Sequence, residues 1–109
     1  MATTYKILGQ LISTANTTSN IYSVPAATST VISTITVCNQ SANAATFRLA
    51  VRPTSEALDA KHYINYDTPI PGNDTITLTL GFTLGATDVV VSNSSTSTIS
   101  YSAFGSEIA

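Results

Sequence analysis

Apolar and hydroxyl-bearing residues alternate along this chain with a period of two. The clearest case runs from Asp74 to Leu80, where every second residue is a threonine and the residues after them are Ile76, Leu78 and Leu80. A helix would spread these residues around its circumference, whereas an extended strand places them on opposite faces. The pattern therefore predicts a strand with one face in a core.

Two further segments repeat this alternation. From Thr30 to Asn39, Val31, Ile35 and Val37 share one face, and Ile32 interrupts the polar residues of the other. From Thr46 to Arg52, the expected inward residues are Phe47, Leu49 and Val51, and the expected outward residues are Arg48, Ala50 and Arg52. Residues of these types favour a pleated, half-buried surface, so both segments are predicted strands.

Shorter strands are predicted between turn signals. They cover Tyr5 to Leu8, Asn20 to Val24, Lys61 to Tyr66, Thr87 to Ser92 and Ser97 to Phe104. Pro, Gly, Asn and Ser cluster between these segments, as they do in turns. One helical turn is expected from Thr54 to Leu58, with Thr54 or Ser55 as its N-cap.

Short strands separated by turns indicate an all-β fold. The expected architecture is an antiparallel β-sandwich of the jelly-roll or Greek-key type, and the pattern does not decide between the two. A chain of 109 residues has room for one core. Residues 1–109 are therefore expected to form a single domain.

Charged residues are scarce in this chain. They make up 9% of it, against about 25% in a typical soluble domain, and 19 Thr and 14 Ser supply polar surface instead. Only four Lys and Arg residues oppose six Asp and Glu residues, which argues against a nucleic-acid partner. Neither a membrane-spanning run nor a signal-peptide core is present in the sequence. We expect a soluble protein, made in the cytoplasm, with no membrane partner.

Few residues could carry chemistry. Cys38 is the only cysteine, which excludes an intrachain disulfide and a cysteine-based metal site. His62 is the only histidine, so any catalytic triad or histidine–metal site would need it. A strand residue that packs its ring is the commoner role of a lone histidine, and no nucleophile elbow or phosphate loop accompanies it. The expectation is a protein without enzymatic activity, cofactor or metal.

Binding surfaces are better candidates. Arg48 and Arg52 share one face of their strand, roughly 13 Å apart at the standard rise. They could pair with carboxylates of a partner or end a solvated strand. Tyr63 shares the predicted face of Asn65 and Asp67. That set is compatible with sugar recognition, although tyrosines more often border a core or anchor a protein interface.

Several segments are more specific than the general pattern. They are Ile7-Leu8-Gly9-Gln10, Tyr22-Ser23-Val24-Pro25-Ala26, Val37-Cys38-Asn39, Phe47-Arg48-Leu49-Ala50-Val51, Lys61-His62-Tyr63-Ile64, Tyr66-Asp67, Asn73-Asp74-Thr75 and Phe104-Gly105-Ser106-Glu107-Ile108. In these segments, and in their order, the chain resembles the small virion structural proteins of tailed bacteriophages, including phages of cyanobacteria and marine bacteria. The shared motifs are structural, with no family active site to carry over.

The resemblance implies a structural role in the virus particle. The preferred interpretation is a capsid cement, or decoration, protein that forms a homotrimer on the head and clamps capsomers of the major capsid protein. The alternatives are a neck, baseplate or tail-fibre component, or a receptor- or carbohydrate-binding module. Ile32 and Val90, on mixed faces, favour self-association. The residues expected at a partner interface are Arg48, Arg52, His62, Tyr63, Phe104 and Ile108.

Overall fold

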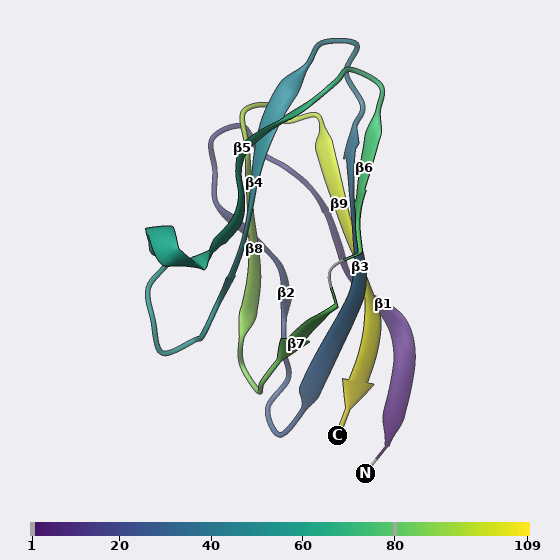
Figure 1. Cartoon of the computed structure of the whole chain (residues 1–109), viewed down its shortest axis with the longest axis vertical. Coiled ribbons are helices and arrows are strands. Elements are labelled where there is room, and N and C mark those ends of the chain that lie inside the picture. Colours follow the sequence, from purple (N-terminus) through teal and green to yellow (C-terminus); the bar gives the residue numbers. More distant parts are fainter. Residues whose placement is uncertain (1, 80) are drawn as a thin grey trace.

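In the part of the chain that the structure describes, nine strands form two antiparallel sheets that pack face to face (Figure 1). The computed structural model describes residues 2–79 and 81–109. Sheet A has the order β1 (Thr3–Ile12), β9 (Ile99–Ile108), β3 (Ser29–Asn39) and β6 (Thr75–Leu78), and β7 (Phe82–Leu84) also pairs with β3. Sheet B has the order β2 (Ser19–Ser23), β8 (Val89–Ser94), β4 (Ala45–Arg52) and β5 (Tyr63–Ile70). The predicted antiparallel β-sandwich is confirmed.

The connectivity is that of a jelly roll. Strands β6 and β7 pair with successive parts of β3, so together they act as one interrupted strand. With these two counted as one, the first strand pairs with the last, the second with the last but one, and so on inward to the β4–β5 pair. This nested pairing defines a jelly roll and settles the question that the alternation left open. Strand β7 was not predicted from the sequence.

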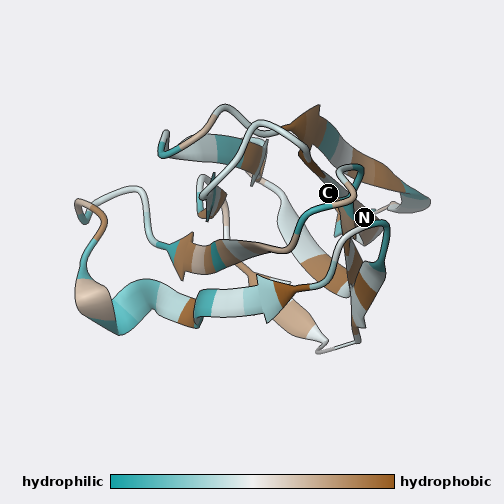
Figure 2. Cartoon of the chain, turned by 90° about the horizontal axis from the view of Figure 1, so that it is seen from above, coloured by the Kyte–Doolittle hydropathy of each residue, from teal (hydrophilic) through white to brown (hydrophobic). Residues whose placement is uncertain are grey.

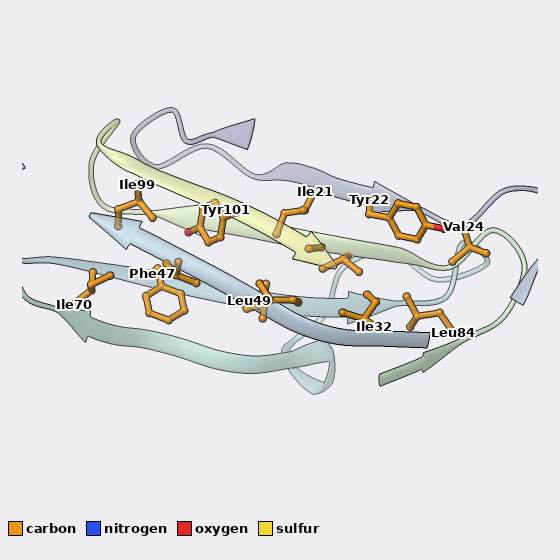
Figure 3. Packing of buried hydrophobic residues seen from close by; sticks show 14 of the residues in the cluster. Ile21, Tyr22, Val24, Ile32, Phe47, Leu49, Ile70, Leu84, Ile99 and Tyr101 are labelled. Carbon is orange, nitrogen blue, oxygen red and sulfur yellow. The ribbon is translucent and has the colours of Figure 1, made fainter. Parts of the chain in front are cut away.

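The core lies between the two sheets, where Phe47 and Leu49 from β4 face Ile99 and Tyr101 from β9 (Figure 3). The rings of Phe47 and Tyr101 meet edge to face, with their centroids 6.4 Å apart. Along the strands, brown apolar segments alternate with pale or teal ones (Figure 2). The inward positions predicted for β4 are confirmed for Phe47 and Leu49, both fully buried, and Val51 packs against the same core.

The predicted face of β3 is wrong at its beginning. The register against β9 shifts between Ile32 and Thr34, so Ser33 is an extra residue in a β-bulge. An extra residue moves every later side chain to the other face. Ile32 therefore lies in the core with Ile35, although one is even and the other odd, and Val31 is only half-buried.

The helical turn expected from Thr54 to Leu58 is also wrong. This segment forms a turn and an irregular loop, and a 3-10 helix follows at Ala60–His62 with Asp59 as its N-cap. Within the described residues, no helix is long and apolar enough to span a bilayer.

Two residues that were expected to favour self-association are buried within the subunit. Ile32 and Val90 belong to the core between the sheets. The large hydrophobic side chains that are exposed lie elsewhere, on β1 and β5: Tyr5, Ile7, Ile12, Ile64 and Tyr66. Position 80, part of the predicted 74–80 strand, falls outside the described residues.

Candidate interaction surfaces

Five of the six residues predicted at a partner interface divide between two opposite outer faces, and the sixth, His62, is buried in the 3-10 helix. Arg48 and Arg52 alternate with the core residues of β4 and lie on the outer face of sheet B, where Tyr63 joins them. Phe104 and Ile108 alternate with Ala103 along β9 and lie on the outer face of sheet A. The structure therefore does not bring these six residues into one surface.

Arg48 is bound to a carboxylate of its own chain. Its Nε lies 2.7 Å from Asp67 Oδ1 and its Nη2 lies 3.2 Å from Asp67 Oδ2, which makes the pair bidentate. Asp67 has a positive φ of 49° and lies where the β4–β5 register shifts. The Asp67 hydrogen bond raises the pKa of Arg48, and the same bond lowers the pKa of Asp67. A partner would meet a neutral ion pair and not a free guanidinium.

The Arg48 guanidinium also stacks on Tyr66, with Cζ 4.0 Å from the ring centroid. Tyr66 meets Tyr63 edge to face, with ring centroids 5.0 Å apart. This contact requires the two tyrosines to share a face, although three positions separate them along one strand. A second register shift in β5, between its pairings at Asn65 and Tyr63, makes this possible. The predicted grouping of Tyr63 with Asn65 is therefore wrong.

Arg52 fixes the loop that follows β4. Its Nη1 donates to the carbonyl oxygen of Glu56 at 3.1 Å. The loop carries Leu58 onto the outer face of sheet B, where Leu58 and Tyr63 cover a small buried cluster of Ala50, Val89 and Val91. Sequence reasoning missed this cluster and expected Ala50 to point outward. The run of three valines at 89–91, apolar on both faces, was the signal for it.

His62 caps the 3-10 helix from a buried position, with only 8% of the residue exposed. Its Nδ1 accepts a hydrogen bond from the Asp59 N–H at 2.9 Å, while the Asp59 carboxylate accepts one from the Ala60 N–H at 2.7 Å. Its Nε2 lies 3.4 Å from Glu56 Oε1 and has no hydrogen-bond partner among the described residues. Most of the ring is unavailable to a partner, and its contacts are those of a helix cap.

Glu56 connects this cap to the surface. Its carboxylate lies 2.7 Å from Lys61 Nζ, and that hydrogen bond holds the pKa of Glu56 below its usual value. The result is a loop fastened by Arg52 at its beginning and by Glu56, Lys61 and His62 at its end.

Two of the hollows on the sheet B side lie beside the contact between Arg48 and Tyr66. The smaller, of about 180 Å³, is polar and is lined by Asn16, Thr46, Arg48, Asp67, Asn93, Ser94 and Ser95. The larger, of about 590 Å³, is lined by Leu58, Asp59, Ala60, Tyr63 and Tyr66. Tyr66 and its neighbour Asp67 line different hollows, although both side chains contact Arg48.

The outer face of sheet A is more apolar. By register, Phe104 lies between Ile7 on β1 and Thr34 on β3, and Ser106 lies between Tyr5 and Val31. A shallow hollow of about 480 Å³ forms there, lined by Tyr5, Lys6, Val31, Ser33, Phe104, Gly105 and Ser106. Phe104 was predicted from the sequence as an interface residue, whereas Tyr5 and Ile7 were not.

No group of three or more His, Cys, Asp or Glu side chains that could hold a metal ion gathers within residues 2–79 and 81–109. Cys38 is a half-buried free thiol on β3.

No protein-family model matches the chain, and no curated protein matches it in sequence. Among solved structures, the chain is similar in fold to a chain in the structure of infectious bursal disease virus Gx strain, with a TM-score of 0.47 and 10% sequence identity. The similarity covers 97% of this chain and 30% of that one, so this chain spans under a third of the length of the viral chain.

Proposed function

We propose that this protein is a structural component of a tailed-phage virion, a capsid cement protein that assembles as a homotrimer on the head and binds the major capsid protein. The observation that carries the proposal is the apolar outer face of sheet A, where Tyr5, Val31 and Phe104 line one shallow surface. Exposed apolar patches of this kind mark sites of protein–protein contact.

The electrostatics of that face suit a contact with another protein. Lys6, a lining residue of this hollow, is bound to Glu107 Oε1 at 2.9 Å, and Glu107 in turn bonds Tyr22 of sheet B, so the ion pair lies towards the inner side and adds no free charge to the outer face. Serines and threonines occupy much of the remaining surface of the strands. A neutral face rich in hydroxyl groups can be desolvated without leaving an unpaired charge. The jelly roll itself recurs in viral capsid domains and in lectins, so the fold is compatible with the proposal without deciding it.

The attachment surface is tested by substitution on reconstituted heads. Phe104→Ser removes the largest apolar side chain of the face, and we expect it to lower binding to heads that lack the protein at least tenfold. Thr77→Ala, on the outer edge of the same sheet, is the matched control and should bind as the wild type does. Equal binding of Phe104→Ser and wild type would contradict the proposal. Truncation after Ala103 is less informative, because it removes half of the strand that pairs with both β1 and β3.

Copy number distinguishes the head from other parts of the particle. A cement protein is expected in hundreds of copies per particle, and a neck, baseplate or tail-fibre component in tens or fewer. Quantitative mass spectrometry of purified particles measures this number directly. A low copy number would favour the neck or tail and reject the cement assignment.

The polar hollow on sheet B favours carbohydrate binding as a second candidate function. Its amide, hydroxyl and carboxylate groups are the donors and acceptors that sugar hydroxyls need. Retention on a glycan array that is lost in Asn93→Ala and kept in Thr77→Ala would support this function. Absence of binding to every glycan would exclude it.

A further inference from the structure

Three of the four Lys and Arg side chains are bound to carboxylates of the same chain. The pairs are Lys6 with Glu107, Arg48 with Asp67, and Lys61 with Glu56. Arg52 is the fourth, and it forms no ion pair among the described residues. A guanidinium without a counter-ion on the outer face of a sheet is a candidate site for an anion.

Two of the three nitrogens of the Arg52 guanidinium have no hydrogen-bond partner among the described residues. Nη1 donates to the carbonyl oxygen of Glu56 at 3.1 Å and lies 3.5 Å from that of Pro53. Nε and Nη2 make no such bond, and neither atom is buried. With the same two atoms, Arg48 binds the Asp67 carboxylate at 2.7 and 3.2 Å. The chain thus contains one example of the bidentate contact that Arg52 can make with a carboxylate from outside.

Arg52 lines a hollow together with Glu56, whose carboxylate is bound elsewhere. Glu56 Oε1 lies 2.7 Å from Lys61 Nζ and 3.4 Å from His62 Nε2. The hydrogen bond from Lys61 lowers the pKa of Glu56, so this carboxylate is ionised and paired at neutral pH. The pair of Glu56 and Lys61 has no net charge, which leaves the positive charge of Arg52 to attract a ligand.

Strand pairing fixes the floor of this hollow, which has a volume of about 420 Å³. By register, Asn20 on β2 lies beside Val91 on β8, and Val91 lies beside Ala50 on β4. Arg52 is two residues beyond Ala50 and therefore shares its outward face. We call this hollow, lined by Asn20, Arg52 and Val91 and by the loop after β4, the Arg52 hollow.

Polar groups that suit sugar hydroxyls line the Arg52 hollow. Asn20, Thr54 and Ser55 are exposed, and their side chains make no hydrogen bond among the described residues. Thr18 Oγ1 accepts a hydrogen bond from Asn93 Nδ2 at 3.3 Å, so its own O–H remains able to donate. Hydroxyl and amide groups both donate and accept, as the hydroxyls of a sugar do.

The hollow also has an apolar wall. Leu58 and Val91 line it, and both belong to the small cluster on the outer face of sheet B. The C–H face of a pyranose ring can pack on such a wall while its hydroxyls meet the polar groups. A cavity of about 150 Å³ admits a benzene ring, so about 420 Å³ gives room for a sugar ring and its substituents.

Charge limits the ligand further. The formal net charge of the chain is -2, which disfavours a ligand with many negative charges. One carboxylate matches the one guanidinium of the hollow. An acidic peptide would supply that carboxylate, but an Asp or Glu side chain brings no hydroxyls to the polar groups around Arg52.

We propose that the Arg52 hollow binds a carboxylate-bearing sugar of the hexuronate class. Its carboxylate is held by Nε and Nη2 of Arg52, and its ring hydroxyls bond the side chains of Asn20, Thr54 and Ser55. The Arg52 hollow lies on sheet B, so it stays open when the outer face of sheet A binds another protein. Uronate binding goes beyond the proposed function, and either can fail while the other stands.

NMR titration of the full chain is the first test. Methyl β-D-glucuronide is the probe, and methyl β-D-glucoside is the matched neutral ligand with the same ring. We expect saturable shifts for the amides of residues 52–58 with the glucuronide, and at least tenfold weaker binding of the glucoside. Absence of saturable shifts, or equal affinity for the two ligands, would overturn the proposal.

Variants test the assigned residues. Arg52→Gln should weaken glucuronide binding at least tenfold. Because Arg52 also holds the loop through its bond to Glu56, Asn20→Ala is the second variant; it leaves that bond intact and should weaken binding several-fold. Thr77→Ala, on the other sheet, is the control and should bind as the wild type does. Circular dichroism verifies folding, and wild-type affinity of Arg52→Gln or of Asn20→Ala would overturn the assignment.

Acetate distinguishes a sugar site from a general carboxylate site. It carries the carboxylate without the ring, so we expect it to bind at least tenfold more weakly than the glucuronide. Equal affinity for acetate and the glucuronide would mean that the hollow recognises a carboxylate alone, as on an acidic peptide, and would reject the sugar.

Discussion

Tyr22 and Glu107 join the two sheets by a hydrogen bond from the phenolic hydroxyl to Oε2, at 2.5 Å. Tyr22 lies on β2 of sheet B and Glu107 on β9 of sheet A. The same hydroxyl lies 2.8 Å from Thr30 Oγ1, and the other carboxylate oxygen pairs with Lys6. A polar tie of this kind, at the border of an apolar core, makes the stability of the sandwich sensitive to pH.

The first prediction concerns acid. The hydrogen bond from Tyr22, followed by the bond from Lys6, lowers the pKa of Glu107 from its ordinary value of 4.5. Because the pKa is lower in the folded state, the ionised carboxylate stabilises the fold at pH values above 4.5. This stabilisation is lost as the pH falls below 4.5 and through the folded-state pKa. Glu107→Gln should therefore be less stable than wild type at neutral pH and lose less stability on acidification. Urea unfolding at several pH values measures the stability at neutral pH and its loss on acidification. Equal losses of stability in Glu107→Gln and in the wild type would contradict the prediction.

The second prediction concerns alkali. Burial, with a further contribution from Glu107 at Tyr22, raises the pKa of Tyr22 and of Tyr101 to about 12. The neutral phenols therefore stabilise the folded state fully at pH values below 10.0, the ordinary pKa. This stabilisation is lost as the pH rises from 10.0 towards about 12, the folded-state pKa. Tyrosinate absorbance should show a late step that diminishes in Tyr22→Phe and in Tyr101→Phe. A late step of unchanged size in both variants would show that other tyrosines produce it.

The third prediction concerns Gly105, which lies opposite the β3 bulge. A Cβ at this position would lie 2.0 Å from the Val31 carbonyl oxygen and 3.0 Å from Ile32 Cα. These are backbone atoms in the middle of sheet A, so β3 would have to move. Gly105→Ala should lower the free energy of unfolding by about 1–3 kcal/mol, the usual cost of overpacking, or more.

Gly85→Ala is the matched control for this clash. Its Cβ would meet only Asp88 Oδ2, at an ordinary 3.5 Å. We expect its free energy of unfolding to stay within about 1 kcal/mol of the wild-type value. If both alanine substitutions lower the free energy of unfolding equally, as measured by urea unfolding, the close approach of β3 to Gly105 does not explain the effect at position 105.

The fourth prediction separates a capping role of His62 from any other. Gln at the third position of a helix can replace His62 Nδ1 as acceptor for the Asp59 N–H, whereas Ala cannot. His62→Ala should therefore cost about 1–2 kcal/mol, the usual loss of a cap, and His62→Gln clearly less. Thermal unfolding of the two variants tests this order of stabilities. A His62→Gln variant less stable than His62→Ala would refute the capping role.

Alternation along the chain was sufficient to predict the class of fold. The period of two in residues 46–52 and 75–78 reflects which face of a strand meets the core, and this depends only on neighbouring residues. Core positions such as Phe47 and Leu49, and the outward position of Arg48, followed from the same local rule. Phe104 and Ile108 were expected at a partner interface together with Arg48, and the local rule did not show that they lie on the opposite sheet from it.

Long-range packing decided everything that depends on a break in that period. The bulge at Ser33 in β3 places Ile32 in the core, and the bulge within β5 brings Tyr63 against Tyr66. A bulge forms where one strand has an extra residue relative to its partner strand, so it depends on strand pairing. The carboxylate that binds Arg48 is 19 positions away along the chain. Local pattern thus specifies which strands form, and only their pairing across the jelly roll determines which side chains meet, because those contacts join residues that no short window of sequence contains.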